Sequence, residues 1–133
     1  MKISNLFVSY ELAKLAKKKG FDEPCIGGYT LSEPELFSVI EEYGFKGKIH
    51  NNSEGITCAP LYQQLVDWLY KEHGIWITIK DNHHTNFTDR ETDGFRCYIT
   101  VYGFCEVGEK EMGTFKTHYE AITKALGEAF TLI

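Results

Sequence analysis

The residues best suited to chemistry lie in one polar stretch, residues 81–93. It contains the adjacent pair His83 and His84 and several carboxylates, among them Asp89 and Asp93. Imidazole and carboxylate groups are common protein ligands of zinc and manganese, so the stretch could form the metal centre of a hydrolase. Its spacing argues against this, because neighbouring residues of a strand point to opposite sides and familiar sites place ligands two to four residues apart. We expect no metal ligand here and interpret the stretch as a long hairpin loop.

Nucleophilic chemistry has no motif in this sequence. Four cysteines stand at positions 25, 58, 97 and 105, without a CxxC pair or a zinc-finger spacing, so we expect free thiols. Cys97 falls on the apolar side of a predicted strand and is expected in the core. A glycine-flanked nucleophile and a phosphate-binding glycine loop are both missing from the sequence. A Cys–His pair stays open, because its members need only be close in space. We expect no enzyme, no catalytic residue and no cofactor.

A basic patch could bind phosphate. Lys14, Lys17, Lys18 and Lys19 lie at the end of a predicted helix, where cations also suit the negative end of the helix dipole. The whole chain is acidic, with 19 acidic and 14 basic residues and a net charge of −5. Because this field opposes polyanions, a nucleic-acid-binding module that uses the Lys14–Lys19 patch is an alternative rather than the main prediction.

The stretch from Ala59 to Lys80 organises the chain. Pro60 suits the first turn of a helix, leucines recur at every fourth position from Leu61 to Leu69, and Gly74 suits the C-terminal cap. The next residues, Ile75–Lys80, alternate as in a strand. Tyr62 and Trp68 lie on the apolar stripe of the helix and are expected in the core, with a peptide groove as the minor alternative.

The remaining elements follow from caps, glycines and periodicity. The sequence predicts a helix from Ser9 to Lys19 closed by Gly20, a bend at Gly27-Gly28, and an exposed loop from Phe45 to Gly55. It predicts a helix from Leu31 to Tyr43, with turn and strand as the alternative for that segment. Strands Phe95–Tyr102 and Phe104–Val107 and a last helix capped by Thr117 follow. The strand Phe95–Tyr102 should pair antiparallel with Ile75–Lys80.

Composition and element order together predict one α+β domain covering residues 1–133. A small antiparallel sheet of two to three strands packs against helices, in the order helix, strand, strand, third strand, helix, with an N-terminal helical segment. The content of 43% hydrophobic and 14% aromatic residues supports a packed core. That core should contain Leu65, Trp68, Leu69, Ile77, Ile99, Ile122 and Leu126. No apolar run is long enough for a membrane span or a signal peptide, so we expect a cytoplasmic protein.

Three stretches carry a resemblance to a known family. They are Val8–Cys25 (VSYELAKLAKKKGFDEPC), Ala59–His73 (APLYQQLVDWLYKEH) and Tyr119–Ile133 (YEAITKALGEAFTLI). They resemble an uncharacterised family of small proteins carried by phages and prophages of Bacteroides-type gut bacteria. The resemblance implies a setting inside a bacterial host cell and brings no catalytic residue with it.

A second resemblance concerns only the order of elements. Helix, strand, strand, strand, helix from Pro60 onward is similar in outline to a double-stranded-RNA-binding domain. Those domains contact phosphate through lysines that open the last helix. Here that helix opens with Thr117-His118-Tyr119, and only Lys116 and Lys124 lie near.

We therefore expect a non-enzymatic phage or prophage accessory protein that acts through protein–protein interaction, with a host or phage protein as its partner. Nucleic acid and membrane are not expected partners, and self-association stays open. The absence of catalytic motifs, the acidic charge and the many aromatic residues all favour this hypothesis.

Overall fold

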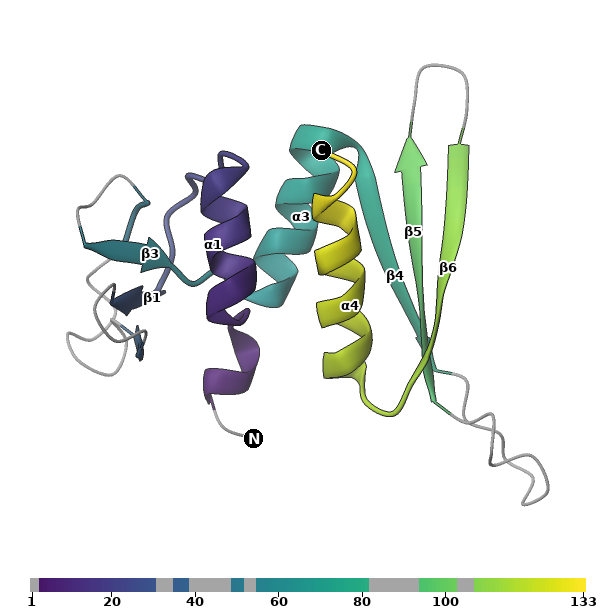
Figure 1. Ribbon diagram of the computed structural model, residues 1–133, viewed down its shortest axis with the longest axis horizontal. Helices are drawn as coiled ribbons and strands as arrows, with labels where there is room; N and C mark the ends of the chain where they lie inside the picture. Colours follow the sequence, from purple (N-terminus) through teal and green to yellow (C-terminus); the bar gives the residue numbers. More distant parts are fainter. Residues whose placement is uncertain (1–2, 31–34, 39–48, 52–54, 82–93, 103–106) are drawn as a thin grey trace. The chain divides into compact units, whose positions relative to one another are not determined.

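The structure is a computed structural model that describes residues 3–30, 35–38, 49–51, 55–81, 94–102 and 107–133. Its elements are the 3-10 helix η1 (Ile3–Leu6), the helices α1 (Tyr10–Lys18), α3 (Tyr62–His73) and α4 (His118–Phe130), and the strands β1 (Gly27–Thr30), β2 (Leu36–Ser38), β3 (Ile56–Cys58), β4 (Ile75–Asp81), β5 (Phe95–Tyr102) and β6 (Val107–Phe115) (Figure 1). The chain divides into two compact units, Met1–Leu65 and Val66–Ile133. We call them the N-terminal and C-terminal units and describe each by itself.

Helix α1 of the N-terminal unit begins and ends as its sequence predicts. The Ser9 hydroxyl accepts a hydrogen bond from the Leu12 amide at 3.3 Å and caps the first turn. At the other end Gly20 has a positive φ of 93°, and the Phe21 amide donates to the Ala16 carbonyl at 2.9 Å. This is a glycine-closed helix end in which the buried Phe21 supplies the apolar contact.

The N-terminal unit also contains a three-stranded antiparallel sheet with the order β2-β1-β3, which the sequence did not predict. The predicted bend at Gly27-Gly28 is wrong, because both glycines lie in the central strand β1. A Cβ atom on Gly27 would overlap the Phe7 ring, and one on Gly28 would lie 3.1 Å from the Phe37 ring. Both positions therefore suit glycine because a phenylalanine ring lies close to the strand backbone, where a side chain would stand.

Two further predictions for this unit need correction. The helix predicted over Leu31–Tyr43 is wrong at residues 36–38, which form strand β2 and pair with β1, and the rest of that segment lies outside the described residues. The predicted exposed loop from Phe45 to Gly55 contains Ile49, which is buried and exchanges two backbone hydrogen bonds with Cys25 at 2.7 and 2.8 Å. In both places, pairing between distant segments overrides the local signal.

The C-terminal unit has the α+β architecture that the sequence predicts. Its sheet has the order β4-β5-β6, and Ile77 pairs with Ile99 at the centre of the antiparallel β4–β5 ladder. Helix α4 contacts all three strands and covers one face of the sheet. That face carries the buried residues Ile75, Ile77, Cys97 and Ile99. The directly paired residues Trp76 and Thr100, one position along each strand, therefore belong to the opposite face.

The third strand is longer than predicted. Strand β6 runs from Val107 to Phe115 and continues through Gly108, where the sequence suggested an end. Residues 103–106, in which that strand was predicted to begin, lie outside the described part. Helix α4 follows with the predicted cap, since the Thr117 hydroxyl accepts from the Glu120 amide at 3.1 Å.

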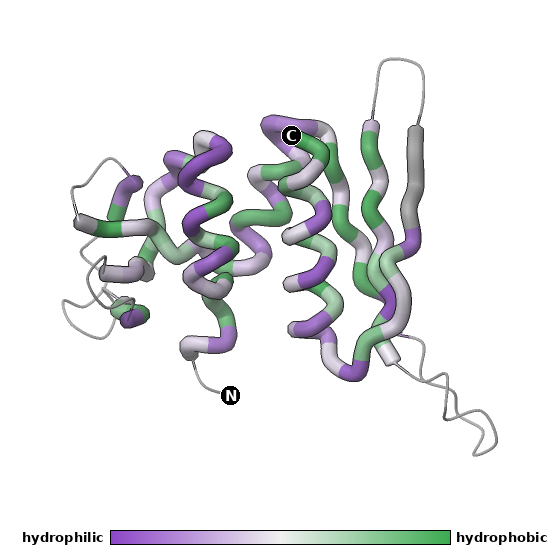
Figure 2. The backbone as a smooth tube through the Cα atoms, in the orientation of Figure 1, coloured by the Kyte–Doolittle hydropathy of each residue, from purple (hydrophilic) through white to green (hydrophobic). Residues whose placement is uncertain are grey.

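Burial agrees with the predicted core. All seven core candidates are buried, namely Leu65, Trp68, Leu69, Ile77, Ile99, Ile122 and Leu126, and so are Tyr62 and Cys97. Figure 2 shows that hydrophobic and hydrophilic residues alternate along the turns of α1 and α4. Each helix therefore has one face suited to burial.

Candidate functional site

The predicted metal loop cannot be placed. Residues 82–93, including His83, His84, Asp89 and Asp93, lie outside the described part of the chain, and only Asp81 is seen, exposed at the end of β4. Among the described residues, no group of three or more His, Cys, Asp or Glu side chains is arranged to hold a metal ion. The hydrolase hypothesis stays a prediction.

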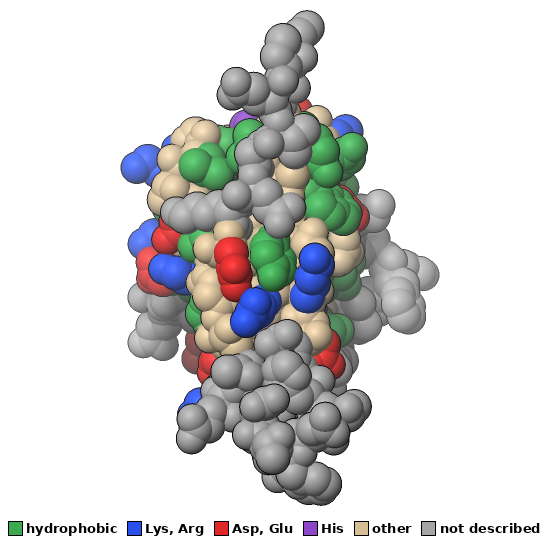
Figure 3. Space-filling model, turned by 90° about the vertical axis from the view of Figure 1, so that its right-hand side faces the viewer, with side chains coloured by type: hydrophobic (Ala, Val, Ile, Leu, Met, Phe, Trp, Pro, Cys, Tyr) green, Lys and Arg blue, Asp and Glu red, His purple; other side chains and the backbone are tan. Residues whose placement is uncertain are grey.

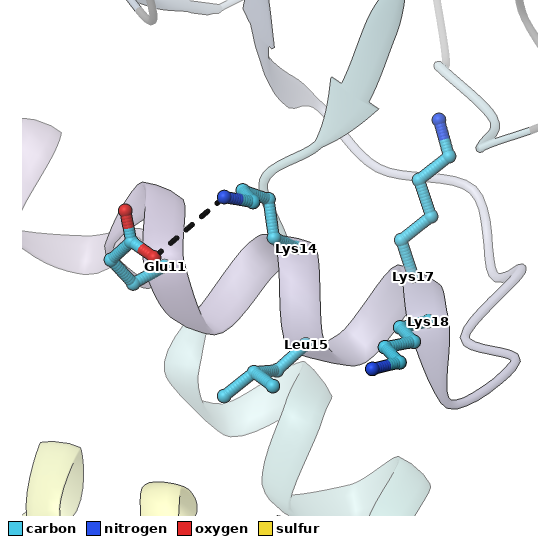
Figure 4. Close-up of a pocket in the computed structure, with 5 residues that line it drawn as sticks. All are labelled: Glu11, Lys14, Leu15, Lys17 and Lys18. Atoms are coloured by element: carbon cyan, nitrogen blue, oxygen red, sulfur yellow. Dashed lines mark ion pairs between the residues drawn. The ribbon is translucent and has the colours of Figure 1, made fainter.

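The predicted basic patch on α1 borders a cavity of about 500 Å³ lined by Glu11, Lys14, Leu15, Lys17 and Lys18 (Figure 4). Two of its lysines are engaged within the N-terminal unit. The Lys14 ammonium lies 3.9 Å from a Glu11 carboxylate oxygen, and the Lys17 ammonium donates to the Ile56 carbonyl at 3.0 Å. Lys17 and Lys18 also leave the helix in different directions. The patch does not gather its charges around one anion.

Two cysteines that are far apart in sequence meet in the N-terminal unit. Cys25 and Cys58 are both buried, and their thiols lie near enough to affect each other's pKa. The Cys58 thiol also donates to the Ile49 carbonyl at 3.2 Å. The hydrogen bond that Cys25 donates lowers the pKa of Cys58, while the same bond and burial raise the pKa of Cys25 far above its usual range.

Cys97 of the C-terminal unit is a buried thiol whose pKa is raised by desolvation. Cys25, Cys58 and Cys97 are free thiols, as predicted, and Cys105 lies outside the described residues. Buried thiols of raised pKa are poor nucleophiles, so Cys25 and Cys97 suit packing better than catalysis.

A different surface stands out in the C-terminal unit, where three aromatic side chains surround a pocket of about 250 Å³. These are Tyr70 on α3, Trp76 on β4 and Tyr102 at the end of β5, and together we call them the aromatic pocket. The Tyr70 ring centroid lies 5.3 Å from that of Trp76 and 5.9 Å from that of Tyr102, with interplanar angles of 75° and 81°. Tyr70 therefore meets both neighbours edge to face, in the arrangement that ring quadrupoles favour.

Gly74 holds these three residues together. It has a positive φ of 66°, its amide donates to the Tyr70 carbonyl at 3.0 Å, and its carbonyl accepts from the Tyr102 amide at 2.8 Å. The helix thus ends and the strand begins within one residue, which brings Tyr70 and Trp76 to the same place. A Cβ atom on Gly74 would lie 3.0 Å from the Tyr102 carbonyl oxygen, so the position suits glycine on two counts.

The aromatic pocket is exposed. Tyr70 is 52% exposed and Tyr102 is 49% exposed. Large apolar side chains at these values are ordinary when single, but a cluster around a hollow marks a binding surface. Figure 3 shows the side of the molecule on which this sheet lies, where hydrophobic side chains stand among acidic and basic ones.

The sheet face around the pocket also carries a contact between a cation and an aromatic ring. The Lys80 ammonium lies 4.8 Å from the centroid of the Tyr98 ring, as in a cation–π contact. Arg96, paired with Lys80 across the strands, forms an ion pair with Glu111 at 3.5 Å. This face therefore combines aromatic rings with two cations. The Tyr98 ring holds Lys80, and the Glu111 carboxylate holds Arg96.

The sequence interpretation missed the aromatic pocket, although a signal was present. Tyr70 lies on the polar side of its helix, three residues after Asp67 and seven after Gln63. Tyr102 lies on the strand face that the sequence assigned away from the core. An aromatic residue on the polar face of a helix and another on the polar face of a strand form the pattern that could have indicated the site.

Comparisons with known proteins give no family. A scan against protein-family models finds no match, and searches of the curated proteins and of the solved structures find none either. Within the described residues, no helix combines the length and apolar character that a membrane crossing requires. Any function must therefore be argued from the surfaces themselves.

Proposed function

We propose that this protein is a non-enzymatic interaction protein that binds a partner protein through the aromatic pocket of Tyr70, Trp76 and Tyr102. The observation that carries the proposal is that two tyrosines about half exposed and one tryptophan surround a hollow on a rigid frame of helix and strand. Trp and Tyr are the residues most often found at the energetic centre of protein interfaces. They provide apolar area together with hydrogen-bonding groups, at a small cost in side-chain entropy.

The polar groups of the pocket support this. Neither the two tyrosine hydroxyls nor the Trp76 indole N–H forms a hydrogen bond with another described residue. Within the described residues, these groups are therefore not used by the fold. The rims of interfaces combine such groups with an apolar centre, which is the composition of this surface.

Nucleic acid is a weaker candidate partner. Lys14 and Lys17 are already engaged within the N-terminal unit, and Lys124 of α4 pairs with Glu128 at 3.2 Å. The order of elements in the second half of the chain matches the outline of a double-stranded-RNA-binding domain, but the lysine cluster that would contact phosphate is missing from the start of α4. A net charge of −5 also opposes approach to a polyanion.

The setting that we propose for this interaction is a bacterial host cell, where the protein acts as a phage or prophage accessory factor on a host or phage protein. The support is the resemblance of Val8–Cys25, Ala59–His73 and Tyr119–Ile133 to small phage and prophage proteins. The acidic charge is compatible with a folded protein partner.

A comparative pull-down from lysate of a Bacteroides-type host tests the proposal. The wild-type protein is compared with the Tyr70→Ala/Tyr102→Ala variant and with Tyr119→Ala, a control at a tyrosine of similar exposure, 46%, on α4. We expect a protein that is captured by the wild type and by the control but lost with the double variant, and that binds again when purified. Equal capture by all three proteins would contradict the proposal, provided that the variants keep the wild-type circular dichroism spectrum.

A further inference from the structure

The aromatic pocket differs from two partly exposed tyrosines of this chain, Tyr10 and Tyr98, in what lies over its rings. The Lys14 ammonium lies 5.2 Å from the centroid of the Tyr10 ring, and the Lys80 ammonium lies 4.8 Å from that of Tyr98. In the described part of the chain, no cation lies over Tyr70, Trp76 or Tyr102, whose ring contacts are with one another. The pocket thus presents aromatic faces of the kind that hold cations elsewhere in this protein.

The electrostatics of these rings favour a cation. The face of an aromatic ring is the negative part of its quadrupole, and tryptophan is the best of the three ring types at attracting a cation. The Trp76 and Tyr102 rings are inclined by 75° and 81° to Tyr70, and all three rings line the same hollow. The net charge of −5 adds a long-range field of the same sign.

Arginine is the cation that fits best. Its guanidinium is planar, stacks on aromatic faces and is less strongly hydrated than an ammonium, so it loses less on entering a half-buried hollow. It also has five N–H donors, and tyrosine, which lines the pocket twice, has a hydroxyl oxygen that can accept a hydrogen bond. The hollow of about 250 Å³ is large enough for one such group and too small for a folded element.

We propose that the aromatic pocket of Tyr70, Trp76 and Tyr102 binds an arginine side chain of the partner protein. This inference rests on the proposed function and adds the chemical identity of the group that the surface recognises. Arginine is among the residues most enriched at interface centres, where it often contacts aromatic side chains. The partner is therefore expected to present a basic, exposed segment to this acidic protein.

Two short peptides of closely similar shape, one charged and one neutral, test the inference on the whole protein. One is acetyl-Gly-Arg-Gly-amide, and the other has citrulline, a neutral residue of the same shape, in place of arginine. The readout is the indole N–H signal of Trp76 in a proton–nitrogen correlation spectrum, which Trp76→Phe identifies among the two tryptophans of the chain. We expect the citrulline peptide to bind about fivefold more weakly, within a range of roughly twofold to thirtyfold.

A matched variant separates the aromatic pocket from the general acidic field. Tyr70→Leu/Tyr102→Leu keeps apolar side chains and the Trp76 signal that reports binding but removes two ring faces, so the preference for arginine over citrulline should disappear. A preference that persists in this variant would show that the overall charge attracts arginine and would refute the inference. If the double variant does not fold, Tyr102→Leu serves alone, because that side chain is half exposed at a strand end.

The peptide result and the pull-down can fail separately. Loss of partner capture with Tyr70→Ala/Tyr102→Ala, together with equal binding of the two peptides, would support the protein-binding surface and overturn its specificity for arginine. A preference for arginine without any captured partner would support the cation site and contradict the proposed interaction.

A second neutral and charged pair of the same shape, 3,3-dimethyl-1-butanol and choline, tests the cation site independently. Equal binding of the two compounds would also count against a cation site.

Discussion

Leu69 provides the sharpest test of the core of α3, because it is fully buried and a matched leucine is exposed elsewhere. Replacing Leu69 with alanine removes three carbon atoms from the interior. At about 0.8 kcal/mol for each buried methylene-sized group, the transfer term is roughly 2.4 kcal/mol. The cavity that remains adds to this, so the total loss should be about 3 to 5 kcal/mol. For a chain of this length, a loss of 3 kcal/mol corresponds to a fall of about 10 °C in melting temperature.

Urea denaturation followed by circular dichroism measures this loss directly. The control is Leu132→Ala, since Leu132 is 55% exposed, and its stability should change by about 0.5 kcal/mol or less. The comparison holds the chemical change constant and varies only burial. A loss below 1 kcal/mol for Leu69→Ala, or equal losses at the two leucines, would refute the assignment of this helix face to the core.

Three other perturbations follow from single contacts. Thr117→Ala removes the cap of α4 and should cost about 1 kcal/mol, or roughly 4 °C in melting temperature, whereas Thr117→Ser should keep most of the stability. Gly74→Ala should cost about 1 to 2 kcal/mol because of the positive φ and the close Tyr102 carbonyl, and the same variant should weaken binding of the arginine peptide. The raised pKa of Cys25 keeps its proton in the folded state above pH 9, while the lowered pKa of Cys58 adds stability above its unfolded value, so unfolding releases one proton from the pair. Relative to Cys25→Ala/Cys58→Ala, the free energy of unfolding of the wild type should therefore fall as the pH rises from 9 to 10, by less than about 1.4 kcal/mol per pH unit because the unfolded thiols ionise over this range, and parallel pH profiles would contradict the pairing.

The sequence predicted the elements whose signals are local. Helix α1 has a serine cap and a closing glycine, α4 has a threonine cap, and β4 and β5 alternate with period two. Each of these signals acts within about five residues, so periodicity and capping chemistry were sufficient. The sheet of the N-terminal unit was missed because its evidence is not local. Strands β2 and β3 have three residues each, and their pairing with β1 is what makes them strands.

Gly27 and Gly28 show why the same residue can mislead. Consecutive glycines usually indicate a turn, because glycine tolerates conformations that other residues avoid. Here neither has a positive φ, and what matters is the missing side chain, which leaves room for Phe7 on one residue and Phe37 on the other. A sequence gives the presence of glycine but not the neighbour that requires it.

The sequence could not show that Tyr102 lies beside Tyr70, for a related reason. Tyr70, Trp76 and Tyr102 are separated by up to 32 positions and belong to three elements, each of which was predicted correctly. The separate elements do not show that the Gly74 carbonyl accepts a hydrogen bond from the Tyr102 amide. This hydrogen bond sets the end of β5 against the end of α3. That single backbone contact fixes the register at which Tyr102 meets Tyr70. None of the three residues is unusual on a protein surface by itself. They form a site because the register of the strands brings them together, and that register is decided by pairing across the sheet rather than by any motif.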